Sequence, residues 1–241
     1  ASAIKTYLAI AALRATSEQL GEDIHLRTRI MRCAPRKPGC EPPERDEDKE
    51  KEPDEDGKRP HDKIYLGQEI TKLLTYSNND SYNRLWDIVG HREANEWMAK
   101  IGFPDVILHH RMDTPAPRSR DTMRTILPVP GKKTLTIRAR DSDYEAKPTP
   151  AQKLIFGDAH YDRGKLIEEP MDFGNKNYSS LADLQRLMIS LLFPNDAEAA
   201  PLGLSDAQRE HLLPALTGRL SRRKFGDDHK PRLRGVVGVD V

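Results

Sequence analysis

The chain begins with Ala1-Ser2-Ala3-Ile4-Lys5-Thr6-Tyr7-Leu8-Ala9-Ile10-Ala11-Ala12. Almost every residue after Lys5 is apolar, so the stretch predicts a buried helix that runs to about Ser17. Positions three apart share a helical face, which places the Ser2 hydroxyl about one turn from the Lys5 amine. Burial lowers the pKa of an amine and lets it act as a base toward a hydroxyl. The pattern predicts an S-x-x-K nucleophile, although a chance serine and lysine on an amphipathic helix look the same.

The composition restricts the class of protein. The 241 residues allow one large domain or two small ones and carry a net charge of +1, which implies no strong attraction to nucleic acid or to a membrane surface. No apolar run reaches transmembrane length. No signal peptide precedes the first helix, so we expect an excerpt whose export signal and flanking strands lie outside it. Such an excerpt would leave its core helix short of packing surface and weakly stable.

A polar insertion is predicted over residues 32–62. Its centre, residues 41–57, contains only charged residues, prolines and one glycine, so we expect a solvated and mobile segment. Cys33 and Cys40 can close a disulfide, as in an oxidising compartment, or remain two free thiols.

The rest of the chain reads as helices with one hairpin. Helices are predicted from Gln68 to Thr75, around Leu85 to Val89, from Glu93 to Ile101, after Ser180, and from Ser205 to near Gly218. The helix after Ser180 should bury Leu184, Leu187, Met188, Leu191 and Leu192. Residues 126–129 and 134–137 should pair as a hairpin through Pro130-Gly131. Residues 105–108 read as a short extended piece, and residues 140–178 as mostly loop.

A second stretch supplies partners for the first: Tyr76-Ser77-Asn78-Asn79-Asp80-Ser81-Tyr82-Asn83. Together with the S-x-x-K opening it resembles the penicillin-recognising serine hydrolases, and most closely the class A β-lactamase family, in which S-D-N follows S-x-x-K. Ser77-Asn78-Asn79 stands in the place of S-D-N. A second register, Tyr76-Ser77-Asn78, is similar to the Y-x-N motif of the class C enzymes. Alternatively, residues 77–79 are an ordinary asparagine-rich helix cap with no catalytic role.

The resemblance implies an α+β fold of the β-lactamase/transpeptidase type, here mainly its helical part, as a partial domain over residues 1–241. It implies that Ser2 forms an acyl-enzyme, with Lys5 as the general base, Ser77 as a proton relay and Asn79 as a positioning group. The Ser2 backbone N–H would form half of an oxyanion hole. Tyr76 and Asn83 join Asn79 as predicted substrate-binding residues. No cofactor and no metal is expected.

Two departures from the family pattern concern activity. In the family, a long loop carries the glutamate that activates the deacylating water. If the start of that loop is matched to His110-Arg111-Met112-Asp113, the place of the glutamate is taken by Pro115-Ala116-Pro117. No glutamate occurs between Glu96 and Glu145. No K-T-G follows the late helices, so we expect that strand outside the excerpt. A stretch at residues 164–177 is similar to a poorly characterised bacterial branch of these hydrolases.

The sequence is therefore consistent with three functions. The first is an exported or periplasmic serine hydrolase acting on an amide or ester, such as a β-lactam or a peptidoglycan-like compound, with slow deacylation. The alternative is a binding module of the same fold, and the third is a helical interaction domain. His109-His110 and residues 158–162 lack metal-site spacing and read as surface or loop residues, and the basic stretch from Arg219 to Arg234 reads as a solvated tail.

Overall fold

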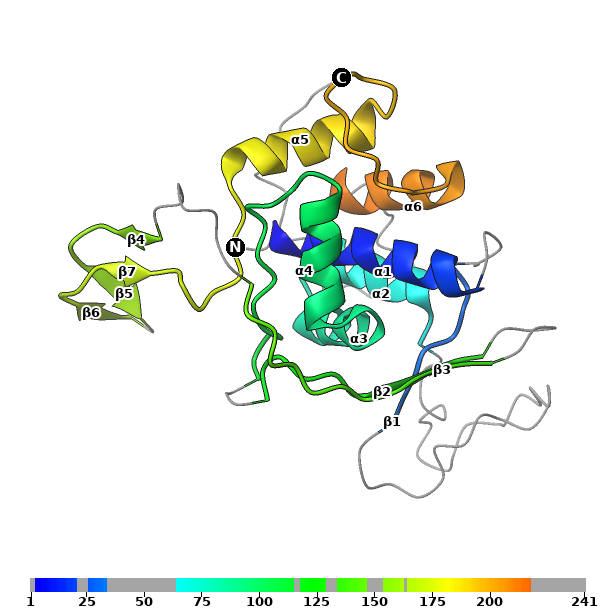
Figure 1. Cartoon of the computed structure of the whole chain (residues 1–241), viewed down its shortest axis with the longest axis horizontal. Helices are drawn as coiled ribbons and strands as arrows, with labels where there is room; N and C mark the ends of the chain where they lie inside the picture. The colour runs from blue at the N-terminus through cyan, green and yellow to red at the C-terminus, as the bar shows by residue number, and fades with distance from the viewer. Residues whose placement is uncertain are drawn as a thin grey trace.

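Helix α1 (Ile4–Leu20) lies at the centre of the molecule (Figure 1). The structure is a computed structural model, and it describes residues 3–20, 26–33, 64–114, 118–128, 134–146, 154–162 and 164–217. The predicted end of this helix at Ser17 is three residues too early. Every residue from Tyr7 to Leu13 is at most 2% exposed, because the helix packs on neighbouring helices on several sides. The expectation that the core helix would lack packing surface is therefore wrong.

Three helices cover α1: α2 (Leu66–Tyr76), α3 (Asn79–Val89) and α4 (His91–Lys100). All three were predicted, and the predicted bounds of α2 and α4 lie within two residues of those observed. Gly90 separates α3 from α4 at φ +94°, and a Cβ there would lie 2.4 Å from a carboxylate oxygen of Glu93. Only glycine adopts this corner without strain, so the two helices turn sharply and both reach α1.

Strands β1 (Met31–Cys33), β2 (Arg124–Leu127) and β3 (Leu135–Ile137) form an antiparallel sheet in that order. Ile126 pairs with Thr136 across β2 and β3, which confirms the predicted hairpin; its turn at Pro130-Gly131 lies outside the described residues. Strand β1 was not predicted, and the expected start of the insertion at residue 32 falls inside it. The rest of that insertion, with Cys40 and its pairing, also lies outside the described residues.

The segment predicted as mostly loop contains two small strand pairs. Strand β4 (Ile155–Phe156) pairs with β7 (Met171–Asp172), and β5 (His160–Asp162) pairs with β6 (Lys165–Ile167). We call these four strands the β4–β7 lobe; it lies to one side of the helices (Figure 1). Most of the described residues between 140 and 178 lie outside these strands, as predicted. The strands themselves were not predicted, because strands this short and exposed show no alternation of apolar and polar residues. The predicted extended piece at 105–108 is reduced to one bridge, from Ile107 to Tyr178.

Helices α5 (Leu181–Leu192) and α6 (Asp206–Thr217) complete the fold. The Ser180 hydroxyl caps α5 by accepting from Asp183 N–H at 3.0 Å, as predicted. The Ser205 and Gln208 side chains each accept from the other residue's backbone N–H at the start of α6. Leu192 is 53% exposed, so its predicted burial is wrong: it lies one residue beyond the buried Leu191, about 100° around the helix.

The elements together make a mainly helical α+β fold, as predicted. Within the described residues, no helix is long and apolar enough to cross a membrane.

Candidate active site

The turn between α2 and α3 brings two predicted site residues onto Lys5. Lys5 leaves the first turn of α1 and is 4% exposed. Its Nζ donates to Asn79 Oδ1 at 2.6 Å, to Ser77 Oγ at 3.0 Å and to the Ser77 carbonyl oxygen at 2.5 Å. Residues 72 and more positions apart in the sequence therefore form one hydrogen-bonded group.

The backbone of Ser77 explains how this turn faces Lys5. Ser77 ends α2 in the left-handed conformation, with φ 57° and ψ 38°. A left-handed residue ends a helix abruptly. Here it leaves both the carbonyl and the hydroxyl of Ser77 on the side of the lysine. A left-handed serine is uncommon, and this geometry persists because Lys5 binds both oxygens.

The two asparagines of the turn have different partners. Asn78 caps α3, since its side-chain oxygen accepts from the Ser81 backbone N–H at 2.8 Å. Asn79 is the asparagine on Lys5. The Ser77/Asn79 register is thus the one that meets the lysine, while Tyr76 is the half-buried last residue of α2.

A buried carboxylate that was not predicted from the sequence, Glu69, joins the helices on both sides of the turn. Glu69 is fully buried and accepts from Ser81 Oγ at 2.7 Å, from Arg84 Nη1 at 2.6 Å and from Lys72 Nζ at 3.2 Å. Burial raises the pKa of Glu69, but the Ser81 hydrogen bond and the Arg84 charge outweigh it and hold the pKa below its usual value. This ionised group joins α2 to the first turn of α3. The signal in the sequence was a lone acidic residue among the apolar residues of α2.

A loop from His109 to Thr114 packs against the turn and the first part of α3. Arg111 Nη1 donates to Asp87 Oδ1 at 2.8 Å, and both side chains are buried. The Asn83 side chain binds the backbone of Met112 through both ends of its amide, each at 2.9 Å. Asn83 was predicted to contact substrate. In this structure it holds the loop, and its contact with substrate stays a prediction.

The loop presents a carboxylate to the Lys5 group. Asn79 Nδ2 donates to Asp113 Oδ2 at 2.6 Å, and Asp113 is an exposed residue with φ 53°. Asn79 therefore lies between the ammonium of Lys5 and the carboxylate of Asp113. The sequence pattern of this loop pointed to a missing glutamate and gave no role to Asp113. Pro115-Ala116-Pro117, placed where the glutamate was expected, lies outside the described residues.

His109 lies in a loop, as one of the two predicted possibilities, but its side chain is buried. It is 8% exposed, and its Nε2 accepts from Arg120 Nη2 at 2.7 Å. Burial, with the charge of Arg120, lowers the pKa of His109 to about 4. The neighbouring buried His91 has its pKa lowered to about 4 by the same two causes. Both rings are neutral at pH 7.

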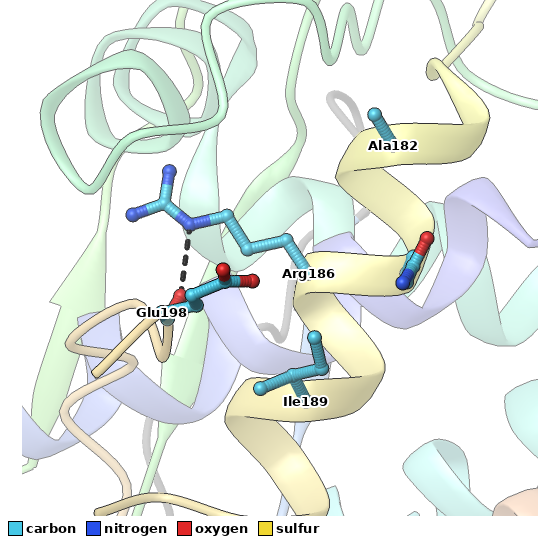
Figure 2. A pocket seen from close by; sticks show the side chains of 5 residues that line it. Ala182, Arg186, Ile189 and Glu198 are labelled. Atoms are coloured by element: carbon cyan, nitrogen blue, oxygen red, sulfur yellow. Dashed lines mark hydrogen bonds between the residues drawn. The ribbon is translucent and has the colours of Figure 1, made fainter. Parts of the chain in front are cut away.

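Further candidate sites contain none of the predicted residues. In the described residues no three His, Cys, Asp or Glu side chains are grouped as metal ligands. A hollow of about 410 Å³ lies on α5 (Figure 2), where Arg186 Nε donates to the Glu198 carbonyl at 3.2 Å. Arg186 Nη1 also donates to the Gly102 carbonyl at 2.6 Å, so this arginine ties α5 to the end of α4. We assign the Arg186 side chain a structural role.

Ser2 and the basic stretch from Arg219 to Arg234 lie outside the described residues, so the contact between Ser2 and Lys5 stays a prediction.

Comparison with known proteins identifies the family. A protein-family model, described as the beta-lactamase enzyme family, matches residues 1–218 of the sequence. No curated protein and no solved structure matches the chain. Because the match covers most of the chain, and because a mainly helical α+β fold accompanies it, the chain belongs to the beta-lactamase enzyme family.

Proposed function

We propose that this chain is a serine hydrolase that forms an acyl-enzyme on Ser2. Membership of the family supports serine hydrolase activity in general. The observation that carries the specific proposal is the contact of Lys5 Nζ with Ser77 Oγ at 3.0 Å and with Asn79 Oδ1 at 2.6 Å. A lysine at the start of the central helix, with a hydroxyl and an amide held on its amine, suits proton transfer at a serine three residues earlier.

In the proposed reaction, Ser2 Oγ attacks the carbonyl carbon of an amide or ester, and its proton passes to Lys5, which reacts as the unprotonated amine. The protonated Lys5 that results is the ammonium form that donates to Ser77 and Asn79. The carbonyl becomes a tetrahedral oxyanion, and the Ser2 backbone N–H provides half of its oxyanion hole. As the bond to the leaving group breaks, the proton moves from Lys5 through Ser77 Oγ to the leaving nitrogen or oxygen. Asn79 holds Lys5 and offers an N–H to the substrate carbonyl. Tyr76 and Asn83 complete the substrate side.

The proposed substrates are β-lactams or peptidoglycan-like compounds, met in the periplasm or outside the cell. Deacylation should be slow, because the family's usual glutamate has no counterpart between Glu96 and Glu145. The same observation favours the second candidate, a binding module of this fold that captures acyl or cell-wall ligands without turnover. The two candidates differ in whether a covalent adduct forms and is later released.

The test is intact-protein mass after incubation with a fluorophosphonate and, separately, with a penicillin. Phosphonylation adds the phosphonyl group to the serine oxygen and releases fluoride, whereas penicillin adds its whole mass through ring opening. We expect both adducts on the wild type, neither on Ser2→Ala, and a penicillin adduct that lasts for hours. The matched control is Ser17→Ala at the other end of α1, where the serine accepts a hydrogen bond from Gln208 Nε2. Absence of both adducts from the wild type would contradict the hydrolase proposal and favour the binding module.

A further inference from the structure

Two residues around the Lys5 group share an unusual backbone conformation. In the described part of the chain, Ser77 and Asp113 are the non-glycine residues with positive φ, at 57° and 53°. Ser77 contacts Lys5, and Asp113 contacts Asn79, which itself contacts Lys5. Left-handed non-glycine residues persist where the surroundings over-determine them, and they cluster at functional sites.

The loop that carries Asp113 is held on both sides of it. On one side, the Asn83 amide binds the Met112 backbone N–H and carbonyl. On the other side, Thr114 Oγ1 donates to the same Met112 carbonyl at 3.2 Å. Two residues before Asp113, the Arg111 side chain is paired with the buried Asp87 of α3. Although Asp113 is exposed, the backbone beside it is held by these contacts, and its carboxylate lies on the Asn79 amide.

The contact with Asn79 also settles which end of the asparagine amide faces which partner. An ammonium can only donate hydrogen bonds, and an ionised carboxylate can only accept them. Asn79 therefore satisfies both neighbours in one orientation, with Oδ1 on Lys5 and Nδ2 on Asp113. The amide nitrogen has a second hydrogen, which this orientation leaves for another acceptor.

We propose that Asp113 is a positioning residue of the active site: its carboxylate anchors the Asn79 amide, so that Oδ1 holds Lys5 and the second N–H is presented to the substrate carbonyl. The proposal rests on the proposed acyl-enzyme function, and it deepens that function by naming the group that orients Asn79. Without the carboxylate, the Nδ2 end of Asn79 bonds to water and rotates, and the substrate must then order it on binding.

Three variants separate the carboxylate from the backbone. Asp113→Gly removes the acceptor and tolerates positive φ, so it does not strain the loop. Asp113→Asn keeps an acceptor oxygen and tolerates the left-handed region. Asp158→Gly makes the same chemical change at an exposed aspartate between β4 and β5, far along the chain from the Lys5 group, and serves as the control.

Acylation rates with two probes provide the first measurement. Penicillin has a carbonyl that needs the Asn79 N–H, whereas a fluorophosphonate mainly reports the reactivity of Ser2. We expect Asp113→Gly to slow acylation by penicillin about 10- to 100-fold and phosphonylation far less, as for loss of a charge-assisted hydrogen bond. Asp113→Asn should retain most of the penicillin rate, and Asp158→Gly all of it. A loss that was equal for both probes and was accompanied by a lower melting temperature would indicate a structural role and overturn the proposal.

The second measurement does not depend on activity. The Asn79 side-chain amide is followed by ¹H–¹⁵N NMR and is assigned by its absence from Asn79→Ala. We expect the two amide protons to differ in shift and to exchange slowly in the wild type, and this difference to shrink in Asp113→Gly but not in Asp158→Gly. Unchanged Asn79 signals in Asp113→Gly would overturn the proposal. If the wild type reacted with neither probe, the hydrolase function would fail, whereas these spectra would still decide whether Asp113 orients Asn79.

Discussion

The helical body around α1 and the β4–β7 lobe bury their side chains to very different extents. In the body, Tyr7 and Trp86 are fully buried, whereas in the lobe Phe156 is 49% and Tyr161 73% exposed. Burial shuts a polar group off from water, so its hydrogen bonds are made with the side chains and backbone packed around it. The fixed contacts of Lys5 and Glu69 occur in the body for this reason. The precision of the candidate site therefore derives from packing, and we expect changes in the exposed lobe to leave the site undisturbed.

The largest expected effect is on acylation. Lys5→Met keeps the buried stem of the side chain but removes the base, and we expect phosphonylation of Ser2 to fall by about 10²- to 10⁴-fold. Lys165→Met makes the same substitution at an exposed residue of the lobe and should leave the rate unchanged. Rates are measured by intact-protein mass against time. A Lys5→Met rate within about threefold of the wild type would remove the general base from the account.

The stability of the two regions should differ by a similarly large amount. Trp86→Ala empties a fully buried site that is stacked on Tyr82 and His91, so the free energy of unfolding should fall by about 3–5 kcal/mol. Tyr161→Ala in the lobe should change it by at most about 0.5 kcal/mol. Urea unfolding followed by circular dichroism measures both. Equal losses would mean that the lobe is packed in solution in a way that this structure does not contain.

Glu69 should make the body sensitive to acid. Its pKa is lowered on folding, so below the unfolded-state value of about 4.5 the unfolded chain binds a proton that the folded chain does not. The stabilisation by Glu69 is therefore present above that pH and is lost as the pH falls through the folded pKa. Glu69→Gln should destabilise the protein by about 2 kcal/mol at pH 7 and flatten the pH dependence below about pH 4.5. An unchanged slope in this variant would assign acid sensitivity to other groups.

His91 and His109 should act in a higher pH window than Glu69. Both have pKa values lowered from 6.5 to about 4, so between these limits the unfolded chain binds more protons than the folded chain. Each histidine should then lower the free energy of unfolding by roughly 2–3 kcal/mol as the pH drops from 6.5 to 4. His91→Phe keeps a ring on Trp86 and removes one titrating group, so its slope in this window should be about half as steep. Equal slopes for the variant and the wild type would show that His91 is not buried as a neutral ring.

The sequence predicted the elements with strong periodicity and missed those that depend on tertiary contacts. The apolar run after Lys5 predicted the central helix, and the Ser77 and Asn79 spacing predicted the residues that meet the lysine. Asp113 was not assigned, because its role follows from a left-handed loop and a contact 34 residues away in the sequence. Strands of two or three residues in the lobe are too short to show a period. Leu192 was assigned to the buried face because it is apolar, but that face is set by helix rotation.

The account depends most on Ser2 as the activated nucleophile, so its most direct test is to locate the adduct. The fluorophosphonate-labelled wild type is digested and its peptides are sequenced by tandem mass spectrometry. The account predicts the phosphonyl group on Ser2, and no labelled peptide from Lys5→Met after the same exposure. Labelling of a different serine, or equal labelling of Ser2 in Lys5→Met, would contradict it.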